Sequence, residues 1–201
     1  IPNFIDFKHY QNQYDKELKK YIAPNGEKII THVSNFRKVK RVEDVIRVFD
    51  GVNKEISSKL LLVGDGPERL KMEALCRKLG LCDLVKFMGK SKSIEAFLSV
   101  SDLFLLPSEA ESFGLVALES MACGVPVVSS NVGGLPELNV QGQTGYLCDL
   151  GDVEGMVTKA LDIFKDDKTL ETFKGKALEH SKKYDLKEVI PLYEKLYASV
   201  L

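Results

Sequence analysis

Short runs of apolar residues alternate with segments of helical periodicity along most of the chain. The apolar runs predict strands, and they occupy 27–34, 59–66, 84–89, 102–108, 125–130 and, more weakly, 144–149. The segments between them repeat apolar residues every three or four positions, as in "RVEDVIRVFDGVNKEI" (41–56), which predicts helices with one apolar face. Apolar strands separated by helices are typical of a parallel sheet covered on both faces. The pattern therefore predicts an α/β fold, a Rossmann-like doubly wound parallel sheet of about six strands.

The pattern becomes purely helical after Gly151. Three helices are predicted at 152–167, 168–184 and 185–201, with Asp152 and Asp185 as N-caps of the first and the last. We therefore expect a single domain, with a lead-in at 1–26, an α/β core at 27–150 and C-terminal helices at 151–201. The chain begins at Ile1 rather than Met, and "IPNFID" resembles the exit of a linker, which indicates a fragment of a longer protein.

Charge and hydropathy limit the kinds of partner that the chain can bind. With 28 basic and 29 acidic residues, the chain lacks the excess positive charge that binding to nucleic acid or an acidic membrane surface requires. No apolar run approaches the roughly 20 residues of a membrane span, and the first residues lack the features of a signal peptide. We expect a cytoplasmic protein with a small-molecule partner.

The cysteines and histidines give no metal signal. The four cysteines show no C-x-x-C spacing, so they are expected to be reduced thiols, and the three histidines are scattered. We therefore predict no metal site, no cofactor and no catalytic histidine.

The candidate binding and catalytic residues are expected in the loops after the strands, because a sheet of this kind binds ligands at the carboxyl ends of its strands. The first loop, "SNFRKVKR", carries the four cations Arg37, Lys38, Lys40 and Arg41 ahead of a helix N-terminus that is already electropositive. Such a cluster suits a phosphate or diphosphate better than it suits the helix, although a solvated basic loop is the alternative.

The second loop, "VGDGPE", is a weaker signal. Gly64 and Gly66 begin a dinucleotide-type fingerprint, but Arg69 occupies the position of its third glycine. A plain turn explains these glycines, and close approach of a ligand to the backbone is the alternative. Gly133 and Gly134 after the fifth strand leave the same two possibilities open.

The loop after the fourth strand carries two acids in an apolar setting. In "SEAESFGLVALESMACGVPVV" (108–128), Glu111 precedes the predicted helix and Glu119 lies within it. Both carboxylates can face one cleft and accept hydrogen bonds from the hydroxyl groups of a polyol. The structural alternatives are a buried Arg or Lys partner for Glu119 and a helix-dipole interaction for Glu111.

The start of that helix is a candidate anion site. Ser112 is predicted to be its N-cap, which leaves the N–H groups of Phe113, Gly114 and Leu115 free. Because Gly114 has no side chain, a ligand can approach these groups closely.

These residues carry a family resemblance. Glu111 and Glu119, with seven residues between them and "SFG" after the first, resemble the E-x7-E signature of the retaining glycosyltransferases of family 4, which have the GT-B fold. "GDGPE", "GGLPE" and "TGYL" resemble that family too, so the likeness covers essentially the whole chain. It implies the C-terminal, nucleotide-sugar-binding half of such an enzyme, with the N-terminal acceptor domain absent.

The resemblance implies roles for individual residues. Glu119 would bind the ribose hydroxyls of a UDP-sugar, Glu111 would contact the donor sugar near its 3- and 4-hydroxyls, and Lys40 matches the phosphate-binding lysine. The family's arginine five positions before that lysine is Asn35 here, so Arg37 is the expected substitute. Further substrate contacts are expected from Ser112, Phe113, Gly114, Leu115, Gly64 and, near the uracil, the backbone at Lys86 or Met88.

The implied reaction is sugar transfer from a nucleotide donor to an acceptor hydroxyl with retention of configuration. "SNFRKVKRVEDV" and "LLLVGDGPE" are most similar to the branch of the family that transfers N-acetylglucosamine from UDP-GlcNAc to L-malate in bacillithiol biosynthesis. That likeness implies UDP-GlcNAc as donor and L-malate as acceptor, with the acceptor bound by the missing domain, so the fragment alone is expected to transfer little. Assembly into a homo-oligomer is left open. The alternatives are an epimerase-type UDP-sugar-binding module, which would need further acids and a histidine at the cleft, and a dinucleotide-binding dehydrogenase domain.

Overall fold

The computed structural model describes residues 1–200 and contains a six-stranded sheet whose strand pairs are all parallel. The strand order is β3-β2-β1-β4-β5-β6, so the chain moves outward from β1 in one direction and then returns to start again at β4. This order confirms the predicted doubly wound fold. The strands are β1 Lys28–Ser34, β2 Ser58–Gly64, β3 Val85–Gly89, β4 Leu103–Leu106, β5 Val127–Ser130 and β6 Gly145–Cys148.

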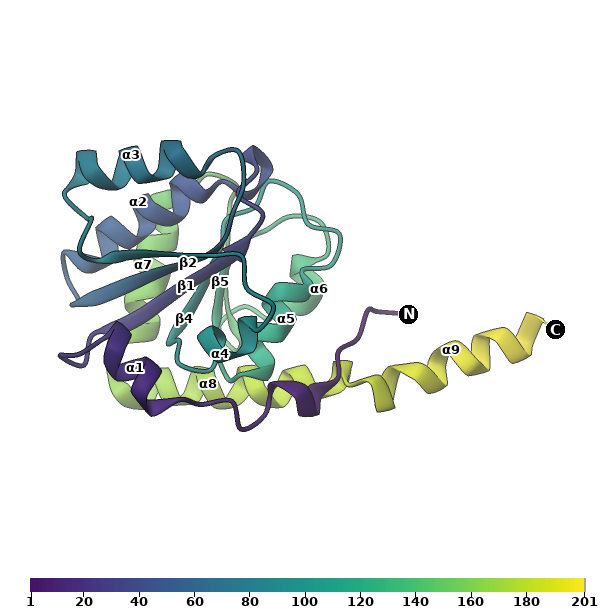
Figure 1. The fold of residues 1–201 in the computed structure, drawn as a ribbon. Coiled ribbons are helices and arrows are strands. Elements are labelled where there is room, and N and C mark those ends of the chain that lie inside the picture. Colours follow the sequence, from purple (N-terminus) through teal and green to yellow (C-terminus); the bar gives the residue numbers. More distant parts are fainter. Residues whose placement is uncertain (201) are drawn as a thin grey trace.

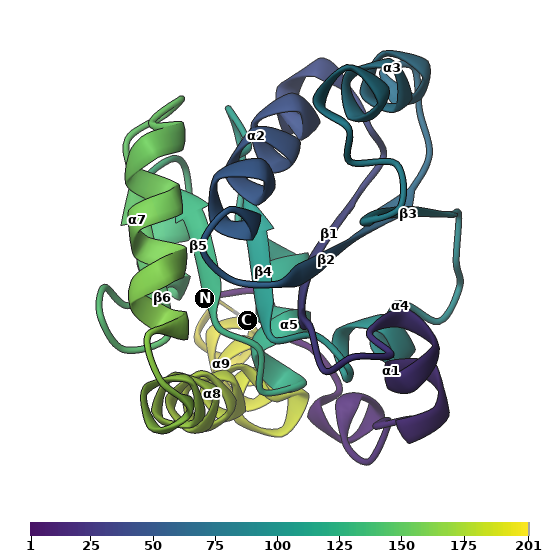
Figure 2. The ribbon, with the colours of Figure 1, turned by 90° about the vertical axis from the view of Figure 1, so that its left-hand side faces the viewer.

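Helices cover both faces of this sheet. Figure 2 shows α2, α3 and α7 on one face and α1, α4, α5 and α8 on the other. Among residues 1–200, none of the helices combines the length and apolarity that crossing a bilayer requires. The helices are η1 Phe7–Tyr10, α1 Lys16–Ile22, η2 Lys38–Lys40, α2 Val42–Asn53, α3 Arg69–Leu79, α4 Ile94–Leu98, α5 Leu115–Ala122, α6 Leu135–Leu138, α7 Val153–Phe164, α8 Asp167–Ser181, η3 Lys182–Tyr184 and α9 Leu186–Val200.

Alternate strand residues fill two core layers. Ile30 and Leu60 pack with the helices of one face, while Ile29 and Leu61, their neighbours in the chain, pack on the other, and all four are fully buried. Side chains alternate between the two faces of a strand, so a sheet with two buried faces needs apolar residues at every position. This requirement explains the unbroken apolar runs of the sequence.

The lead-in, residues 1–26, packs against the body of the domain and contains η1 and α1. The Ile5 N–H donates to the Tyr184 carbonyl at 3.0 Å, and the Leu186 N–H donates to the Ile5 carbonyl at 2.8 Å. Farther along, the Gln11 amide donates to the Ala122 carbonyl at 2.7 Å, at the end of α5. Figure 1 shows α9 extending away from the body as a continuous helix, on the same side as the N-terminus.

A buried aspartate ties the lead-in and α8 to the sheet. Asp102, which is 3% exposed, accepts hydrogen bonds from Lys174 at 2.8 Å, from Lys19 at 3.4 Å and from the Ile29 N–H at 2.9 Å. Burial alone would raise the pKa of Asp102, but the attraction and hydrogen bond of Lys174, with the other two donors, hold it below the ordinary aspartate value. The ionised form therefore stabilises the fold.

Replacing this carboxylate should destabilise the domain. We expect Asp102→Asn to lower the free energy of unfolding by about 3 kcal/mol at pH 7, because two lysines lose a buried partner. A group whose folded pKa is depressed contributes stability above its unfolded pKa and loses it as the pH falls through the folded value. The difference between wild type and variant should therefore shrink below about pH 4.

Urea unfolding at pH 7 and pH 3 measures the difference in the free energy of unfolding between wild type and Asp102→Asn. The matched control is Asp167→Asn, because Asp167 also pairs with a lysine, Lys28, but its side chain is 91% exposed. That variant should stay within about 0.5 kcal/mol of wild type. Equal effects of the two substitutions would contradict the role given to Asp102.

Candidate functional site

The loop after β1 is held by a buried histidine. His32 Nδ1 lies 2.8 Å from the Leu105 carbonyl, and Nε2 lies 2.8 Å from the Ser34 hydroxyl. Because a carbonyl only accepts, Nδ1 carries the proton and the hydroxyl donates to Nε2. Burial lowers the pKa of His32 to about 4, so the ring is neutral at pH 7. Ser34 in turn accepts from the Phe36 N–H at 3.2 Å, so the network links the end of β4 to the loop.

The same loop contains two residues in the left-handed region. Phe36 has φ +37°, and Arg41 has φ +48°. Such angles cost non-glycine residues of the order of 1 kcal/mol or more, so other contacts must hold them. The Phe36 ring is fully buried, and Arg41 pairs with Asp44 at 2.6 Å. The turn between them therefore has a fixed course, and it ends in η2 with Lys40.

Lys40 and Glu111 meet across two loops. Lys40 Nζ lies 2.6 Å from Glu111 Oε1, and their side chains are 22% and 12% exposed. The two residues follow β1 and β4, which are neighbours in the sheet. Glu111 thus has a cationic partner that the sequence analysis did not assign to it.

The start of α5 differs from the prediction. The helix begins at Leu115 with Gly114 as its N-cap, at φ +90°, and no side chain caps it, so the prediction of Ser112 as N-cap was wrong. An N-cap normally has extended φ and ψ angles, and here the left-handed glycine turns the chain into the helix instead. Within the described residues, the N–H groups of Phe113, Gly114 and Leu115 donate to no backbone carbonyl.

The loop before α5 lies directly on the loop after β5. A Cβ atom on Gly133 would lie 1.8 Å from the Glu111 carbonyl oxygen, and one on Gly134 would lie 2.5 Å from the Ser112 carbonyl oxygen. The Gly134 N–H donates to the Glu111 carbonyl at 3.0 Å. These two glycines therefore serve contact between loops and fix the backbone that carries Glu111.

Glu119 is held from the lead-in. The Tyr10 hydroxyl donates to Glu119 Oε1 at 2.8 Å. Burial raises the pKa of Glu119, and the hydrogen bond from Tyr10 acts in the opposite direction. Burial, with this same carboxylate as neighbour, raises the pKa of Tyr10, so its hydroxyl is the donor. The buried Arg or Lys partner considered for Glu119 is replaced by a tyrosine.

The two acids line one hollow of about 390 Å³ at the carboxyl end of the sheet. The segments that follow β1, β3 and β4 surround it, together with the lead-in, and the lining residues are Asn3, Val33, Ser34, Asn35, Lys40, Ile94, Glu111, Ser112, Phe113, Gly114, Leu115, Val116 and Glu119. An adjacent hollow shares Val33, Ser34, Asn35 and Ile94 with it and adds Val63, Gly64, Asp65, Lys90 and Ser91. Together they form a groove along the strand ends.

Gly64 lies in this groove, but its conformation has a structural cause. Its φ is +126°, and a Cβ there would lie 1.8 Å from the Ser34 carbonyl oxygen. A Cβ on Gly66 would similarly lie 2.0 Å from the Asn35 carbonyl oxygen. Close contact of the first two strand-end loops thus accounts for the "GDG" turn.

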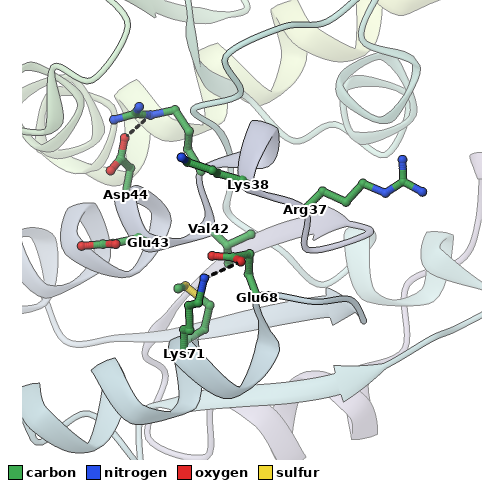
Figure 3. Close-up of a pocket in the computed structure, with 9 residues that line it drawn as sticks. Arg37, Lys38, Val42, Glu43, Asp44, Glu68 and Lys71 are labelled. Atoms are coloured by element: carbon green, nitrogen blue, oxygen red, sulfur yellow. Dashed lines mark hydrogen bonds and ion pairs between the residues drawn. The ribbon is translucent and has the colours of Figure 1, made fainter.

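Two predicted site residues lie elsewhere. The Lys86 ammonium stacks over the Tyr21 ring at 4.6 Å, partway along β3, and the strand-end residues beside the groove are Lys90 and Ser91. Arg37 lines a separate hollow between α2 and α3, together with Lys38, Arg41, Glu43, Asp44, Glu68 and Lys71. Figure 3 shows the Arg37 side chain pointing away from the Glu68–Lys71 ion pair.

Metal ligands do not gather in the described part of the chain, where no group of three or more His, Cys, Asp or Glu side chains could hold an ion. The four cysteines are free thiols.

Comparison with known proteins identifies the family. The model of the family described as "Glycosyl transferases group 1" matches residues 13–180. The chain belongs to this family. The match includes every strand of the sheet and the loops that carry Lys40, Glu111 and Glu119.

The relatives are longer proteins. The chain is 44% identical to N-acetyl-alpha-D-glucosaminyl L-malate synthase of Bacillus anthracis, a match that covers 100% of this chain and 53% of that protein. It is 32% identical to the sulfoquinovosyl transferase SQD2 of Arabidopsis thaliana over 90% of this chain and 36% of the relative. The chain thus spans about half the length, or less, of the glycosyltransferases that it matches.

The fold comparison agrees. Anabaena HepE, solved in complex with UDP, superimposes with a TM-score of 0.88 over 98% of this chain and 56% of that one, at 23% identity. This likeness confirms the GT-B type of sheet and helices that the sequence predicted.

The loop contact at Gly133 gives a testable result. We expect Gly133→Ala to lower the free energy of unfolding by about 2–4 kcal/mol, because the added Cβ overlaps the Glu111 carbonyl and φ is +52°. Thermal and urea unfolding measure this change.

Gly175→Ala is the matched control. Gly175 lies within α8, and a Cβ there meets no atom within 4 Å. Alanine should stabilise the helix by up to about 1 kcal/mol. If Gly133→Ala were equally harmless, the loop-on-loop packing would not constrain the site.

Proposed function

We propose that this chain is the donor-binding half of a retaining glycosyltransferase that transfers N-acetylglucosamine from UDP-GlcNAc to the hydroxyl of L-malate. The observation that carries the proposal is the convergence of Lys40, Glu111, Glu119 and free backbone N–H groups on one hollow. The name of the 44% identical relative supports this choice of donor sugar and acceptor.

The diphosphate would bind between Lys40 and the start of α5. An ammonium group has three N–H donors, and the bond to Glu111 uses one of them, so Lys40 retains donors for a phosphate oxygen. The N–H groups of Phe113, Gly114 and Leu115 add donors that need no reorganisation. Asn35, which lines the same hollow, offers an amide donor at the position of the family's arginine.

The hydroxyl groups of the donor would bind to the two acids. Glu111 is ion-paired through Oε1, which leaves Oε2 to accept from the sugar hydroxyls. Glu119 is bonded to Tyr10 through Oε1, which leaves its other oxygen for the ribose. Each carboxylate is thereby held in one orientation before the ligand arrives.

The reaction breaks the bond between C1 of the sugar and the bridging oxygen of UDP, and it forms a bond from C1 to the acceptor oxygen. The acceptor proton passes to the departing phosphate or to solvent, and negative charge grows on the phosphate. Lys40 and the backbone N–H groups lie where they stabilise this charge, so their effect is larger in the transition state than in the ground state. Arg37 is not among the residues that line the groove, so the proposal assigns it no contact with the diphosphate.

The acceptor would be bound by groups outside this chain, since the chain spans only 53% of the N-acetyl-alpha-D-glucosaminyl L-malate synthase of Bacillus anthracis. The epimerase-type alternative has less support, because His32 is enclosed beneath the loops as a neutral ring and does not line the groove.

Titration calorimetry on the 201-residue chain tests the donor site. We expect UDP and UDP-GlcNAc to bind more tightly than GDP or NAD. Lys40→Ala should raise the Kd for UDP by about 10- to 100-fold and change the Kd for uridine little, because only UDP carries the phosphates that Lys40 contacts. Lys176→Ala on α8 removes the same charge at an exposed position and should leave both constants unchanged. Equal affinities for all four nucleotides would refute the assignment.

Activity is tested on the complete gene product. We expect it to convert UDP-GlcNAc and L-malate to an α-linked product, with the configuration read from the anomeric proton coupling in NMR spectra. The 201-residue chain should transfer at least about 1,000-fold more slowly, because positioning of the acceptor is lost. A β-linked product, or rapid transfer by the isolated chain, would contradict the proposal.

A further inference from the structure

We propose that Tyr10 is a positioning residue of the donor site, which holds the Glu119 carboxylate so that its second oxygen faces the ribose of the nucleotide. This inference rests on the proposed function, because it assigns the ribose to Glu119. It makes the lead-in a part of the nucleotide site and gives a tyrosine outside the E-x7-E segment a role in it.

The hydrogen bond from Tyr10 to Glu119 joins two distant parts of the chain beside the hollow. Tyr10 ends the short helix η1, and its hydroxyl reaches Glu119 on α5, 109 positions later in the chain, at 2.8 Å. Tyr10 does not line the hollow itself, whereas Glu119 does. The tyrosine thus contacts Glu119 from outside the hollow, and the other carboxylate oxygen of Glu119 is left for a ligand.

Glu119 needs such a partner. The titratable groups that face it are Glu95 from α4, which repels it, and His9 from η1, whose Nε2 lies 3.7 Å from Glu95. Within the described residues, no lysine or arginine is among them. Cys123, at the end of α5, is turned toward the Tyr10 carbonyl at 3.8 Å. A partly buried carboxylate with a like charge nearby is therefore oriented by a single strong neutral donor.

The hydroxyl can be removed without detaching the segment. Backbone bonds at Ile5 and the Gln11–Ala122 bond hold η1 independently of the Tyr10 side chain. Phenylalanine retains the ring, which lies edge-on to His9 at 5.1 Å. A Tyr10→Phe variant thus isolates the hydrogen bond from the packing.

The test compares UDP with 2′,3′-dideoxy-UDP on the 201-residue chain by titration calorimetry. Tyr10→Phe should raise the Kd for UDP about five- to tenfold and leave the Kd for the dideoxy nucleotide unchanged, because only UDP presents the ribose hydroxyls. In a Glu119→Gln background, which alters the group that Tyr10 orients, Tyr10→Phe should have a smaller effect.

The pH profile gives a second readout. The hydrogen bond from Tyr10 lowers the pKa of Glu119, so its loss should raise that pKa. The affinity for UDP, which falls when Glu119 becomes protonated, should then begin to fall at a higher pH in Tyr10→Phe than in the unaltered chain. Tyr14→Phe is the matched control, since Tyr14 belongs to the same lead-in and is 59% exposed. It should bind both nucleotides as the unaltered chain does, with an unchanged profile.

The outcomes separate this inference from the proposed function. If the unaltered chain does not bind UDP, the proposed function fails, and the role of Tyr10 fails with it. If the unaltered chain binds UDP and Tyr10→Phe binds it equally well, only the role of Tyr10 is overturned. A Tyr10→Phe variant that weakens both nucleotides equally, or whose melting temperature falls, would show a structural residue and also overturn it.

Discussion

The ion pair between Lys40 and Glu111 joins the loops that follow β1 and β4, and the geometry of the site depends on it. These strands are neighbours at the point where the winding of the sheet reverses direction, which is where crevices form in such folds. A cation and an acid from two halves of the fold meet there with limited solvent exposure, and each fixes the other. The proposed sugar-nucleotide donor would need a cation for its phosphates and an acceptor for its sugar hydroxyls close together, and this pair offers both.

Backbone contacts keep these loops in place. Gly66 lets the loop after β2 touch the loop after β1, and Gly133 does the same for the loops after β5 and β4. His32 adds a neutral hydrogen-bonded link between the first and fourth strand ends. The site is therefore supported mainly by direct contact between main chains, which explains why glycine-containing motifs accompany the acidic pair in the sequence.

The sheet could be predicted because burial on both faces demands continuous apolar runs, and Glu111 and Glu119 stood out because such surroundings are costly for acids. Other features depend on contacts that no local pattern records. Tyr10 and Asn3 reach the site from a polar lead-in, so nothing in their neighbourhood distinguishes them. Serine is a residue type that favours the N-cap position, but the left-handed turn at Gly114 moves the start of α5 to Leu115. The direction of the Arg37 side chain depends on the course of the strained loop before Lys40.

The short bridge at Ile5 has a mechanical consequence. It pairs the beginning of the chain with the junction of η3 and α9 through two backbone hydrogen bonds, so both ends leave the domain together (Figure 1). A force applied at the first residues would break these two bonds one after the other. The six strands would be loaded only later, and they would unfold together as one cooperative unit. The contacts of Phe7, whose N–H donates to the Asp185 carboxylate at 3.5 Å, would break next, followed by the hydrogen bond of the Tyr10 hydroxyl to Glu119. Tension on the amino-terminal end would thus free the Glu119 carboxylate from its tyrosine partner while the sheet remained intact.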